Sequence, residues 1–420
     1  MLKQFRRSLP PVTHEVLAAV GVLSKDLGYK AYLVGGIVRD IVIGYSNIDL
    51  DIVVDGDGVE VARAFAVRTG AVFKGPTRFG TSKVASKAFG TVDFATARTE
   101  SYRRPGALPD TQRSTIGKDL VRRDFTMNAM AISLDPADCG VLIDPYGGLK
   151  DISGRRLRVL HDRSFLDDPT RILRGVRFAA RYGFRFETNT LGILKECLAA
   201  GCLKSISGKR AYTELKHICA GDRPARGLSM LQRYGMLSAM HPALTLYGRE
   251  TGRLGRAIES VETAAGRGFL RLWLCWLSSL FVYLGGSKAE YIITYFNPQS
   301  DVRDVLLWVS SDLKKTGTRL GKLSVRDAYK AVKLLRMVPP EGLVHLYAAS
   351  PPGARNVIRR YLADWRHVTP RLSGGEIASL GIGEGPRVGK ILEDILKLRL
   401  EGKIKTRTDE LSYVRKFRGA

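Results

Sequence analysis

The sequence predicts an α+β protein, in which a mixed α/β module over residues 1–150 precedes a long all-helical region. Short β-rich runs alternate with helix-like segments in the first 150 residues, whereas from about residue 160 onward the pattern is helical, with few strand signals. A chain of 420 residues can hold two to four domains of about 100–200 residues each. Hydrophobic residues make up 45% and charged residues 26% of the chain, so the composition argues against disorder.

The strands of the N-terminal module are predicted from β-rich runs, the first of which is closed by Gly35 and Gly36. The predicted ranges are residues 31–34, residues 48–54 and two runs within residues 82–97, with Gly90 at the turn between those two. A short helix is expected to begin near Val38, after the first strand. Farther along, Pro339-Pro340 and Pro351-Pro352 indicate breaks between helices.

The charge of the chain is unusually positive, with 67 Lys and Arg against 41 Asp and Glu, a formal net charge of +26. Residues 1–150 carry 20 basic and 16 acidic side chains, residues 151–300 carry 23 and 12, and residues 301–420 carry 24 and 13. Lys and Arg bind polyanions by contacting phosphates and releasing counterions. The last two thirds are therefore the expected polyanion surface, and the first third the expected place for catalytic carboxylates.

The five cysteines are an odd number and form no C-x-x-C pair, which argues against a disulfide framework or a zinc site and favours a reducing compartment. The longest apolar run, Leu272 to Leu284, is shorter than the about 20 residues of a bilayer span and predicts a buried helix. The basic N-terminus leads into no apolar signal core. We expect a cytoplasmic protein that does not enter a membrane.

Two acidic side chains lie on one face of the strand predicted at 48–54. Because strand side chains alternate between faces, Asp49 and Asp51 point one way, while Ile48, Leu50 and Ile52 point toward the core. Two such carboxylates can bind Mg²⁺ together with substrate phosphates, and two ions could activate an attacking hydroxyl. The alternative is a half-buried strand with a solvated acidic face.

The segment LVGGIVRD at 33–40 favours the metal hypothesis. Gly35 and Gly36 end a strand before a helix, and backbone N–H groups at such a turn bind anions. Arg39 adds a fixed positive fork. On the later run at 92–98, Asp93 is a candidate third carboxylate and Arg98 a candidate phosphate contact, although both could be ordinary strand residues.

The segment DDPTRILRGVRFAARYGF predicts a helix that is capped by Asp167 or Asp168, with Pro169 in its first turn. Asp168 and Arg171 are three residues apart and share one helix face. A carboxylate accepts from an exocyclic amine and an arginine donates, so this pair fits cytosine and adenine and mismatches uracil and guanine. The alternative is an ordinary salt bridge in the first turn of a surface helix.

Further basic residues surround these candidates. Arg122, Arg123 and Asp124 stand together in VRRDFTMNA, before a predicted apolar helix, where they could also be a solvated charge cluster. Arg174 and Arg177 follow Arg171 by one and two turns, and they could line a nucleotide pocket or the RNA path, or be surface charge.

The motifs LVGGIVRD, IDLDIVV, DLVRRDFTMNAMAI (119–132), DPYGGLKDI (144–152) and DDPTRILRGVRFAARYGFRFE (167–187) together resemble the class II tRNA nucleotidyltransferases and bacterial poly(A) polymerases, which belong to the polymerase-beta-like nucleotidyltransferase superfamily. A weaker similarity continues through GKRAYTEL (208–215) to the C-terminal segment. The resemblance implies a nucleotidyltransferase head at 1–150 and three helical parts: a base-recognising neck at 151–220, a body at 221–300 and a tRNA-binding tail at 301–420.

The resemblance also implies roles for residues of these motifs. The implied catalytic residues are Asp49, Asp51 and Asp93, of which Asp49 and Asp51 bind Mg²⁺. The implied nucleotide-binding residues are Gly35, Gly36, Arg39, Asp40, Arg98, Arg122, Arg123, Asp124, Asn128, Asp168, Arg171, Arg174 and Arg177. Among them, Gly35, Gly36 and Arg39 are expected at the triphosphate, and Asp168 and Arg171 at the incoming base.

The implied activity is template-independent addition of C, A or both from CTP and ATP to the 3′ end of tRNA, with the acceptor arm as partner. Addition of CC only or of A only stays open, since Asp167 stands where many CCA-adding members have Glu, and the loop at 99–120 is not obviously shortened. Poly(A) synthesis is less favoured because the C-terminal third resembles tRNA enzymes. The two retained acids argue against a non-catalytic RNA-binding protein, and the charge of residues 151–420 argues against a small-molecule transferase.

Overall fold

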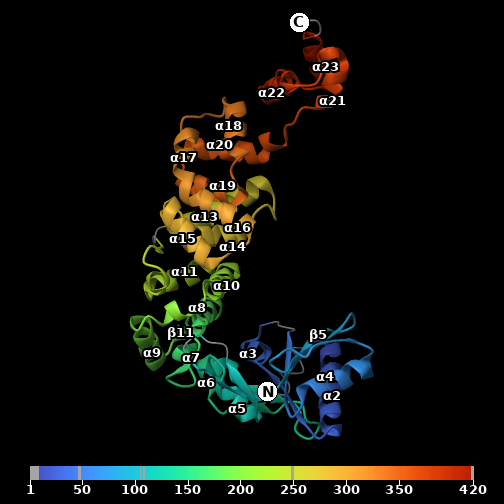
Figure 1. The fold of residues 1–420 in the computed structure, drawn as a ribbon, viewed down its shortest axis with the longest axis vertical. Helices are drawn as coiled ribbons and strands as arrows, with labels where there is room; N and C mark the ends of the chain where they lie inside the picture. Colours follow the sequence, from blue (N-terminus) through green and yellow to red (C-terminus); the bar gives the residue numbers. More distant parts are fainter. Residues whose placement is uncertain (1–8, 46–48, 105, 107–108, 247–249, 418–420) are drawn as a thin grey trace. The chain divides into compact units, whose positions relative to one another are not determined.

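The structure is a computed structural model that describes residues 9–45, 49–104, 106, 109–246 and 250–417. The chain divides into two compact units (Figure 1). One consists of Met1–Glu214 with Tyr234–Ala239, and the other of Leu215–Arg233 with Met240–Ala420. All described strands belong to the first unit, and the second is helical, which confirms the predicted α+β class. The division into four parts at 150, 220 and 300 stays a prediction.

The first unit is built on a seven-stranded mixed sheet with the order β3-β4-β5-β2-β1-β8-β9. The strands are β1 Lys30–Val34, β2 Leu50–Asp55, β3 Val72–Lys74, β4 Thr81–Ser86, β5 Gly90–Thr96, β8 Ala131–Ser133 and β9 Leu142–Ile143. Strand β2 runs antiparallel to β1 and parallel to β5. The predicted strands are confirmed, and the one predicted from residue 48 is seen from Leu50, while Ile48 lies outside the described residues.

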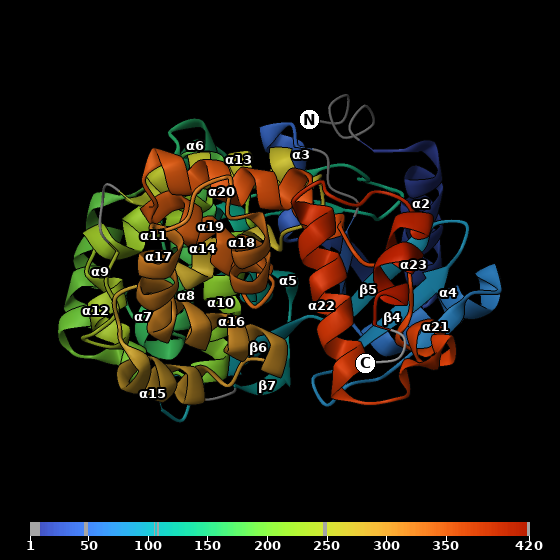
Figure 2. The ribbon, with the colours of Figure 1, turned by 90° about the horizontal axis from the view of Figure 1, so that it is seen from above.

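Two short sheets complete the strands. One pairs β6 (Arg98–Ser101) with β7 (Asp110–Arg113), and the other pairs β10 (Arg156–Leu157) with β11 (Arg185–Phe186). The helical segments of this unit are α2 Pro11–Asp26, α3 Gly36–Ile43, α4 Gly58–Thr69, α5 Ile116–Val121, η1 Thr126–Asn128, α6 Gly148–Ser153, α7 Ser164–Asp167, α8 Thr170–Tyr182, α9 Thr188–Ala199 and η2 Cys202–Ser205. In Figure 2, α4 lies beside β4 and β5, and α2 packs against α4 and β1.

Two local expectations differ from the structure. Helix α3 begins at Gly36 rather than near Val38, because Gly35 adopts a φ of 78° and turns the chain directly after β1. The apolar helix predicted after Asp124 is wrong: a single turn, η1, leads into strand β8. Residues 129–132 are fully buried, since β8 lies inside the sheet between β1 and β9, and such a run cannot be distinguished from a buried helix by periodicity.

The cysteines also differ from expectation. The sequence argued against a disulfide framework, yet the structure joins Cys197 at the end of α9 to Cys202 at the start of η2. Gly201, with a φ of 73°, reverses the chain between them and brings the two Cα atoms to 5.6 Å. Cys219 and Cys275 are buried free thiols.

The second unit is helical throughout its described residues. Its helices are α11 Pro224–Arg233, α13 Glu250–Ala265, α14 Leu272–Ser278, α15 Gly286–Phe296, α16 Ser300–Ser311, α17 Leu313–Leu320, α18 Ala328–Leu335, α19 Pro340–Ala349, α20 Pro352–Ala363, η3 Trp365–His367, α21 Gly374–Ile377, η4 Ala378–Ile382, α22 Pro386–Leu400 and α23 Arg407–Arg415. Helices α10 (Gly208–Ala220) and α12 (Met236–Met240) cross the division between the units.

Among the described residues of the second unit, two hydrophobic clusters stand out. The larger is formed by residues of α13, α17, α18, α19 and α20, and the smaller by residues of α21, α22 and α23. Helices α19 and α20 begin at Pro340 and Pro352, which confirms the predicted breaks. The apolar run from Leu272 is buried for the most part, although Leu272 and Tyr283 are exposed, and its helix ends at Ser278. Among the described residues, no helix combines the length and the apolar character needed to cross a membrane.

Candidate active site

A cavity of about 400 Å³ in the first unit gathers residues from distant parts of the sequence. It opens between the turn after β1, strand β2, the end of β6, the segment after α5, and helix α8. Its lining consists of Gly35, Gly36, Arg39, Asp51, Glu100, Tyr102, Arg122, Arg123, Asp124, Asn128, Asp168, Arg171, Arg174 and Phe178. Most of the predicted site residues therefore meet at one place.

The glycine turn lies directly beside the strand acids. A Cβ atom on Gly35 would stand 3.4 Å from Asp51 Oδ2 and 3.3 Å from Arg123 Nη1, and the φ of 78° disfavours any other residue. Because α3 starts at Gly36, its N-terminal N–H groups open toward the same space. The turn thus leaves room for an anionic group between a helix N-terminus and a carboxylate.

The predicted strand acids form a row with a third carboxylate. Asp49 and Asp51 are exposed, while Leu50 and Ile52 are 4% and 1% exposed, so the predicted alternation is confirmed. Asp93 is the direct partner of Asp51 across the parallel pair of β2 and β5. On its other side Asp93 forms a 2.8 Å ion pair with Lys83.

The electrostatics of Asp51 follow from this row. The walls of the cavity remove hydration from Asp51 and raise its pKa above the usual value, and the charges of Asp93 and Asp49 raise it further, against the opposing charge of Arg123. A divalent cation would relieve this repulsion. Among the described residues no group of three or more potential ligand side chains converges on one point. Two carboxylates are nevertheless a suitable donor set for Mg²⁺, which takes its other ligands from water and substrate phosphates.

Acidic side chains bind Arg122 and Arg123 through hydrogen bonds. Asp119 is fully buried, and it accepts hydrogen bonds from Arg122 Nη2 at 2.6 Å and from Arg123 Nη2 at 3.0 Å. Burial alone would raise the pKa of Asp119, but the two guanidinium groups outweigh it and hold the pKa below the usual value. Glu100 accepts a second bond from Arg122, at 2.8 Å. Both cations therefore have fixed positions at the cavity wall.

Buried hydrogen bonds and ion pairs also hold Asp124 and Asn128 of the VRRDFTMNA segment, and Arg39 of α3. Asp124, 3% exposed, accepts from Asn128 Nδ2 at 2.9 Å and pairs with Arg174 at 2.6 Å. Burial acts to raise the pKa of Asp124, but Arg174 and Asn128 hold it below the usual value. Arg39 is 5% exposed and bonds to Asp40 and Asn128.

The predicted base-reading pair is not a salt bridge. Asp168 accepts from Thr170 N, from Thr170 Oγ1 and, at 2.8 Å, from Arg210 Nη2, all through Oδ1. Arg171 is 4% exposed, and it donates to Ser164 Oγ and to the Arg122 carbonyl. The alternative of a first-turn surface salt bridge between Asp168 and Arg171 therefore does not describe this helix. Both side chains reach the cavity separately.

Five of the predicted residues do not line the cavity. Asp49 and Asp93 flank Asp51 on the sheet, and Asp40 lies behind Arg39. Arg98 donates to Glu100 and to the Phe79 carbonyl. Arg177 pairs with Glu214 at 3.5 Å.

Sequence reasoning missed Phe178, which lines the cavity, and four polar or charged residues around it. Asp119 stands three and four residues before Arg122 and Arg123, a helical spacing that could have revealed it. No such spacing marks Glu100, Tyr102 and Arg210. They lie far along the sequence from the site residues that they approach, and only folding brings them together.

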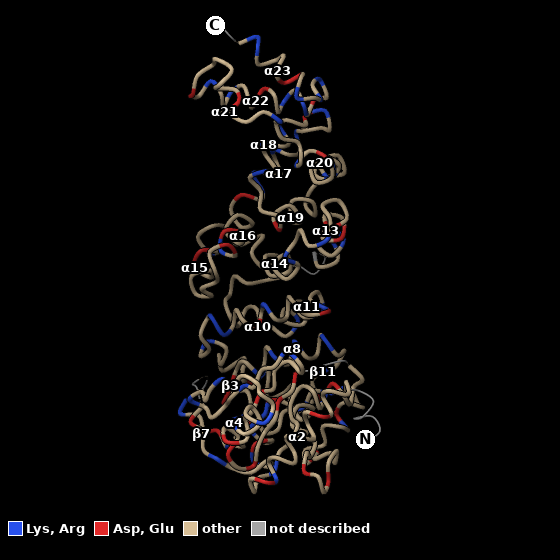
Figure 3. Tube along the Cα trace, turned by 90° about the vertical axis from the view of Figure 1, so that its right-hand side faces the viewer, with Lys and Arg blue, Asp and Glu red and all other residues tan. Residues whose placement is uncertain are grey.

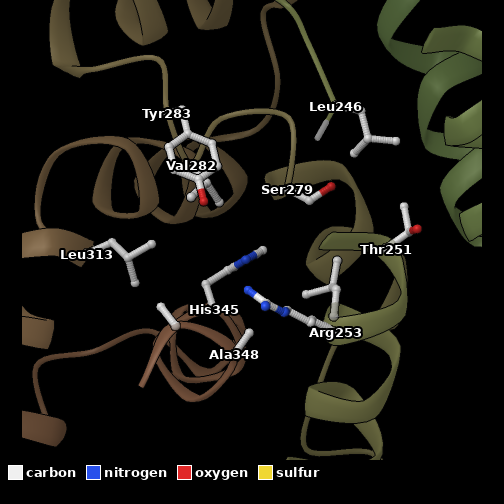
Figure 4. Close-up of a pocket in the computed structure, with 11 residues that line it drawn as sticks. Leu246, Thr251, Arg253, Ser279, Val282, Tyr283, Leu313, His345 and Ala348 are labelled. Atoms are coloured by element: carbon white, nitrogen blue, oxygen red, sulfur yellow. The ribbon is translucent and has the colours of Figure 1, made fainter. Parts of the chain in front are cut away.

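A smaller cavity of about 80 Å³ lies in the second unit, where Figure 4 shows His345 and Arg253 projecting into it. His345 shares a 2.7 Å hydrogen bond with Ser278 Oγ, and burial lowers its pKa to about 4, so the ring is neutral at pH 7. The residues that line it include no carboxylate and none of the predicted site residues.

Comparisons with known proteins agree with this geometry. Residues 31–158 match the Poly A polymerase head domain, and residues 183–247 match the "Probable RNA and SrmB- binding site of polymerase A". An A-adding tRNA nucleotidyltransferase of Halalkalibacterium halodurans is 31% identical over 96% of this chain and 92% of its own length. Another, of Geobacter sulfurreducens, is 31% identical over 96% of this chain, which spans about half (47%) of that relative's length.

Solved structures of tRNA nucleotidyltransferases also resemble this chain over nearly its whole length. An apo CCA-adding enzyme matches with a TM-score of 0.86 at 28% identity, over 99% of this chain and 98% of the other. The Thermotoga maritima CCA-adding enzyme in complex with tRNA matches with a TM-score of 0.81 at 28% identity, over 99% and 97%. The chain belongs to the family of class II tRNA nucleotidyltransferases and bacterial poly(A) polymerases.

Proposed function

We propose that this protein adds C, A or both to the 3′ end of tRNA, using CTP and ATP and releasing pyrophosphate. The observation that carries the proposal is the single cavity in which Asp51, the Gly35 turn and a set of fixed arginines meet. A carboxylate, a helix N-terminus and cations around one space are what an incoming nucleoside triphosphate requires.

In the proposed reaction the terminal 3′-oxygen of the RNA bonds to the α-phosphorus of the nucleotide. The bond to the bridging oxygen breaks, and pyrophosphate leaves. Asp49 and Asp51 would hold Mg²⁺, which when bound supplies charge neutralisation and lowers the pKa of the attacking hydroxyl. Arg39 and the N–H groups of α3 bind and orient the triphosphate, while Arg122 and Arg123 balance the charge that develops on it.

The incoming base is proposed to be read by Asp168 and Arg171. Since Oδ1 of Asp168 already accepts three hydrogen bonds, Oδ2 is the oxygen that would accept from the exocyclic amine of C or A. Arg171 would donate to the neighbouring ring nitrogen. Uracil and guanine would leave buried groups unmatched, at a cost of about 1–3 kcal/mol each.

Addition of A alone is the version that the relatives favour. Curated proteins named A-adding tRNA nucleotidyltransferase are 31–33% identical to this chain over 89–96% of its length. A CC-adding relative is 29% identical over 92% of the chain. The length of the product on tRNA tests this version directly.

The test uses tRNA transcripts that lack one, two or three 3′ nucleotides, each incubated with CTP, ATP or both. An A-adding enzyme extends only the transcript that ends in CC, and only with ATP. A CCA-adding enzyme restores all three transcripts, and a CC-adding enzyme stops one nucleotide short. Absence of any extension with Mg²⁺ would reject the proposal.

We propose that the tRNA is held in part by a basic groove in the second unit. A groove of about 570 Å³ between α17 and α18 is lined by Lys315, Arg319, Lys330 and Lys333, with Tyr329 and Met337 beside them. Residues 312–336 contain eight Lys and Arg and two acids, Asp312 and Asp327, and Figure 3 marks the basic positions along the trace. Such a surface suits RNA phosphates, while Tyr329 and Met337 offer contact to ribose or base. The cytoplasmic location stays a prediction.

A further inference from the structure

A continuous chain of hydrogen bonds connects α8, α3 and η1 behind the cavity. Tyr182 Oη donates to Asp40 Oδ1 at 2.8 Å. Asp40 accepts from Arg39 Nε at 2.8 Å and from Arg39 Nη2 at 3.0 Å, in a two-point pair. Arg39 Nη1 donates to Asn128 Oδ1 at 2.7 Å, and Asn128 Nδ2 donates to Asp124 at 2.9 Å. Asp40 is 1% and Arg39 5% exposed, so the chain is shielded from water.

The guanidinium of Arg39 is fixed in orientation by this chain. Three of its five N–H groups donate to Asp40 and Asn128. Its Cζ lies 4.8 Å from the ring centre of Tyr182 and 5.2 Å from that of Phe178, and these two rings stack at 23°. Two N–H groups remain, one on each Nη, for which no acceptor is seen among the described residues, and the side chain of Arg39 lines the cavity.

We propose that Tyr182 is a positioning residue for the triphosphate: through Asp40 it fixes Arg39 so that the outer edge of the guanidinium meets the phosphates. This inference rests on the proposed function. Tyr182 itself does not line the cavity, so it acts only through its neighbours. Burial raises the pKa of Tyr182 well above its usual value, which keeps the hydroxyl a donor at every pH suitable for an assay.

The competing role is purely structural, since Tyr182 is also the last residue of α8 and packs edge-on against Tyr45. The variant Tyr182→Phe separates the two roles because it keeps the ring and its stacking and removes only the donor. Isothermal titration calorimetry of the full chain without RNA, in Mg²⁺ buffer, measures the affinity for ATP, CTP, AMP and CMP.

We expect Tyr182→Phe to weaken ATP and CTP binding about tenfold, the scale of one charge-assisted hydrogen bond, and to change AMP and CMP binding less than about twofold. The matched control is Tyr45→Phe. It removes a hydroxyl from the same aromatic group and should leave all four affinities unchanged. The variants Asp40→Asn and Asp40→Asn with Tyr182→Phe should bind ATP equally weakly, because Tyr182 acts through Asp40.

Several outcomes overturn the inference. The inference fails if Tyr182→Phe binds ATP as tightly as the wild type does. It also fails if the variant loses affinity for triphosphates and monophosphates equally, or if the double variant binds ATP more weakly than Asp40→Asn alone. The thermal midpoint of each variant shows whether a loss reflects unfolding. If the wild-type chain binds ATP and CTP while Tyr182→Phe binds them as tightly, the inference fails and the proposed function stands. If the wild-type chain binds neither nucleotide, both fail.

Discussion

The cavity of the first unit, which is proposed to bind the nucleotide, differs from the basic groove of the second unit in how its positively charged side chains are held. At the cavity, Arg122 and Arg123 are held by the fully buried Asp119, and Arg174 is paired with the buried Asp124. In the groove, Lys330 and Lys333 form exposed ion pairs with Asp327 and Glu393, whereas Lys315 and Arg319 are exposed and have no ion pair among the described residues. The cavity therefore fixes its donors in space, while the groove leaves Lys315 and Arg319 free to move.

Fixed and mobile cations recognise a nucleotide or an RNA in different ways. Fixed donors discriminate by geometry, because a base or phosphate that is misplaced leaves a buried group without a partner. Mobile cations in water contribute through counterion release, which depends on charge and hardly on geometry. The cavity should therefore respond strongly to single conservative substitutions, and the groove mainly to the removal of charge.

The largest effect is expected at the strand acid of the cavity. Asp51→Asn keeps the shape of the side chain and removes its charge, so nucleotide incorporation should fall at least about a thousandfold with the loss of several kcal/mol of stabilisation. Binding of tRNA in a filter assay should change less than about twofold, since the groove is untouched. The control is Asp55→Asn on the same strand, which should retain incorporation. Full turnover by Asp51→Asn would contradict the mechanism.

The next largest effect is expected at the acid behind the arginines. Asp119→Asn leaves Arg122 and Arg123 without their buried partner, and it should lower the free energy of unfolding by about 3 kcal/mol, measured by urea denaturation. Asp110→Asn removes the acid of an exposed ion pair with Arg103 and should change the stability by less than about 0.5 kcal/mol. Equal values for the two variants would mean that burial does not matter at this pair.

The groove should show a smaller effect that depends on salt. Lys315→Gln combined with Arg319→Gln should weaken tRNA binding about tenfold at low salt and reduce the slope of log K against log[salt] by about 1.5, because two phosphate contacts are lost. Incorporation at saturating tRNA should be unchanged. Arg359→Gln combined with Arg360→Gln, beside Glu259 and Asp364 on another surface, is the matched control. Unchanged RNA binding by the groove variant would assign the groove to another partner, such as an acidic protein.

The smallest effect is a gain in stability from Asp51→Asn. The folded-state pKa of Asp51 is raised, so its ionised form destabilises the metal-free protein above that pKa, and the penalty disappears below the unfolded value of about 3.9. In EDTA at pH 7 the thermal midpoint of Asp51→Asn should exceed that of the wild type, by a small amount because water screens the charge of this exposed side chain, and the difference should shrink as the pH falls. Mg²⁺ should raise the midpoint of the wild type more than that of the variant. A lower midpoint for Asp51→Asn at pH 7 would refute this.

The sequence allowed the parts of the site that depend on local spacing to be predicted. The alternation that exposes Asp51 and the glycine turn before α3 are properties of a few adjacent residues. The contact between Asp51 and Asp93 depends on the parallel pairing of β2 with β5, and the bond from Arg210 to Asp168 spans 42 residues. Spacing carries no information on such contacts, and the strand after Asp124 was mistaken for a helix because it is buried on both faces.

The most direct test of the central claim keeps the charge and changes only the geometry. Arg171→Lys at the cavity and Arg319→Lys in the groove are compared for incorporation, as kcat/KM for CTP and ATP, and for tRNA affinity. The account predicts that Arg171→Lys loses at least about tenfold in kcat/KM, because lysine cannot reproduce the two fixed bonds to Ser164 and the Arg122 carbonyl. Arg319→Lys should change neither quantity by more than about twofold. Equal losses for the two variants, or full activity of Arg171→Lys, would contradict the distinction between fixed and mobile charge.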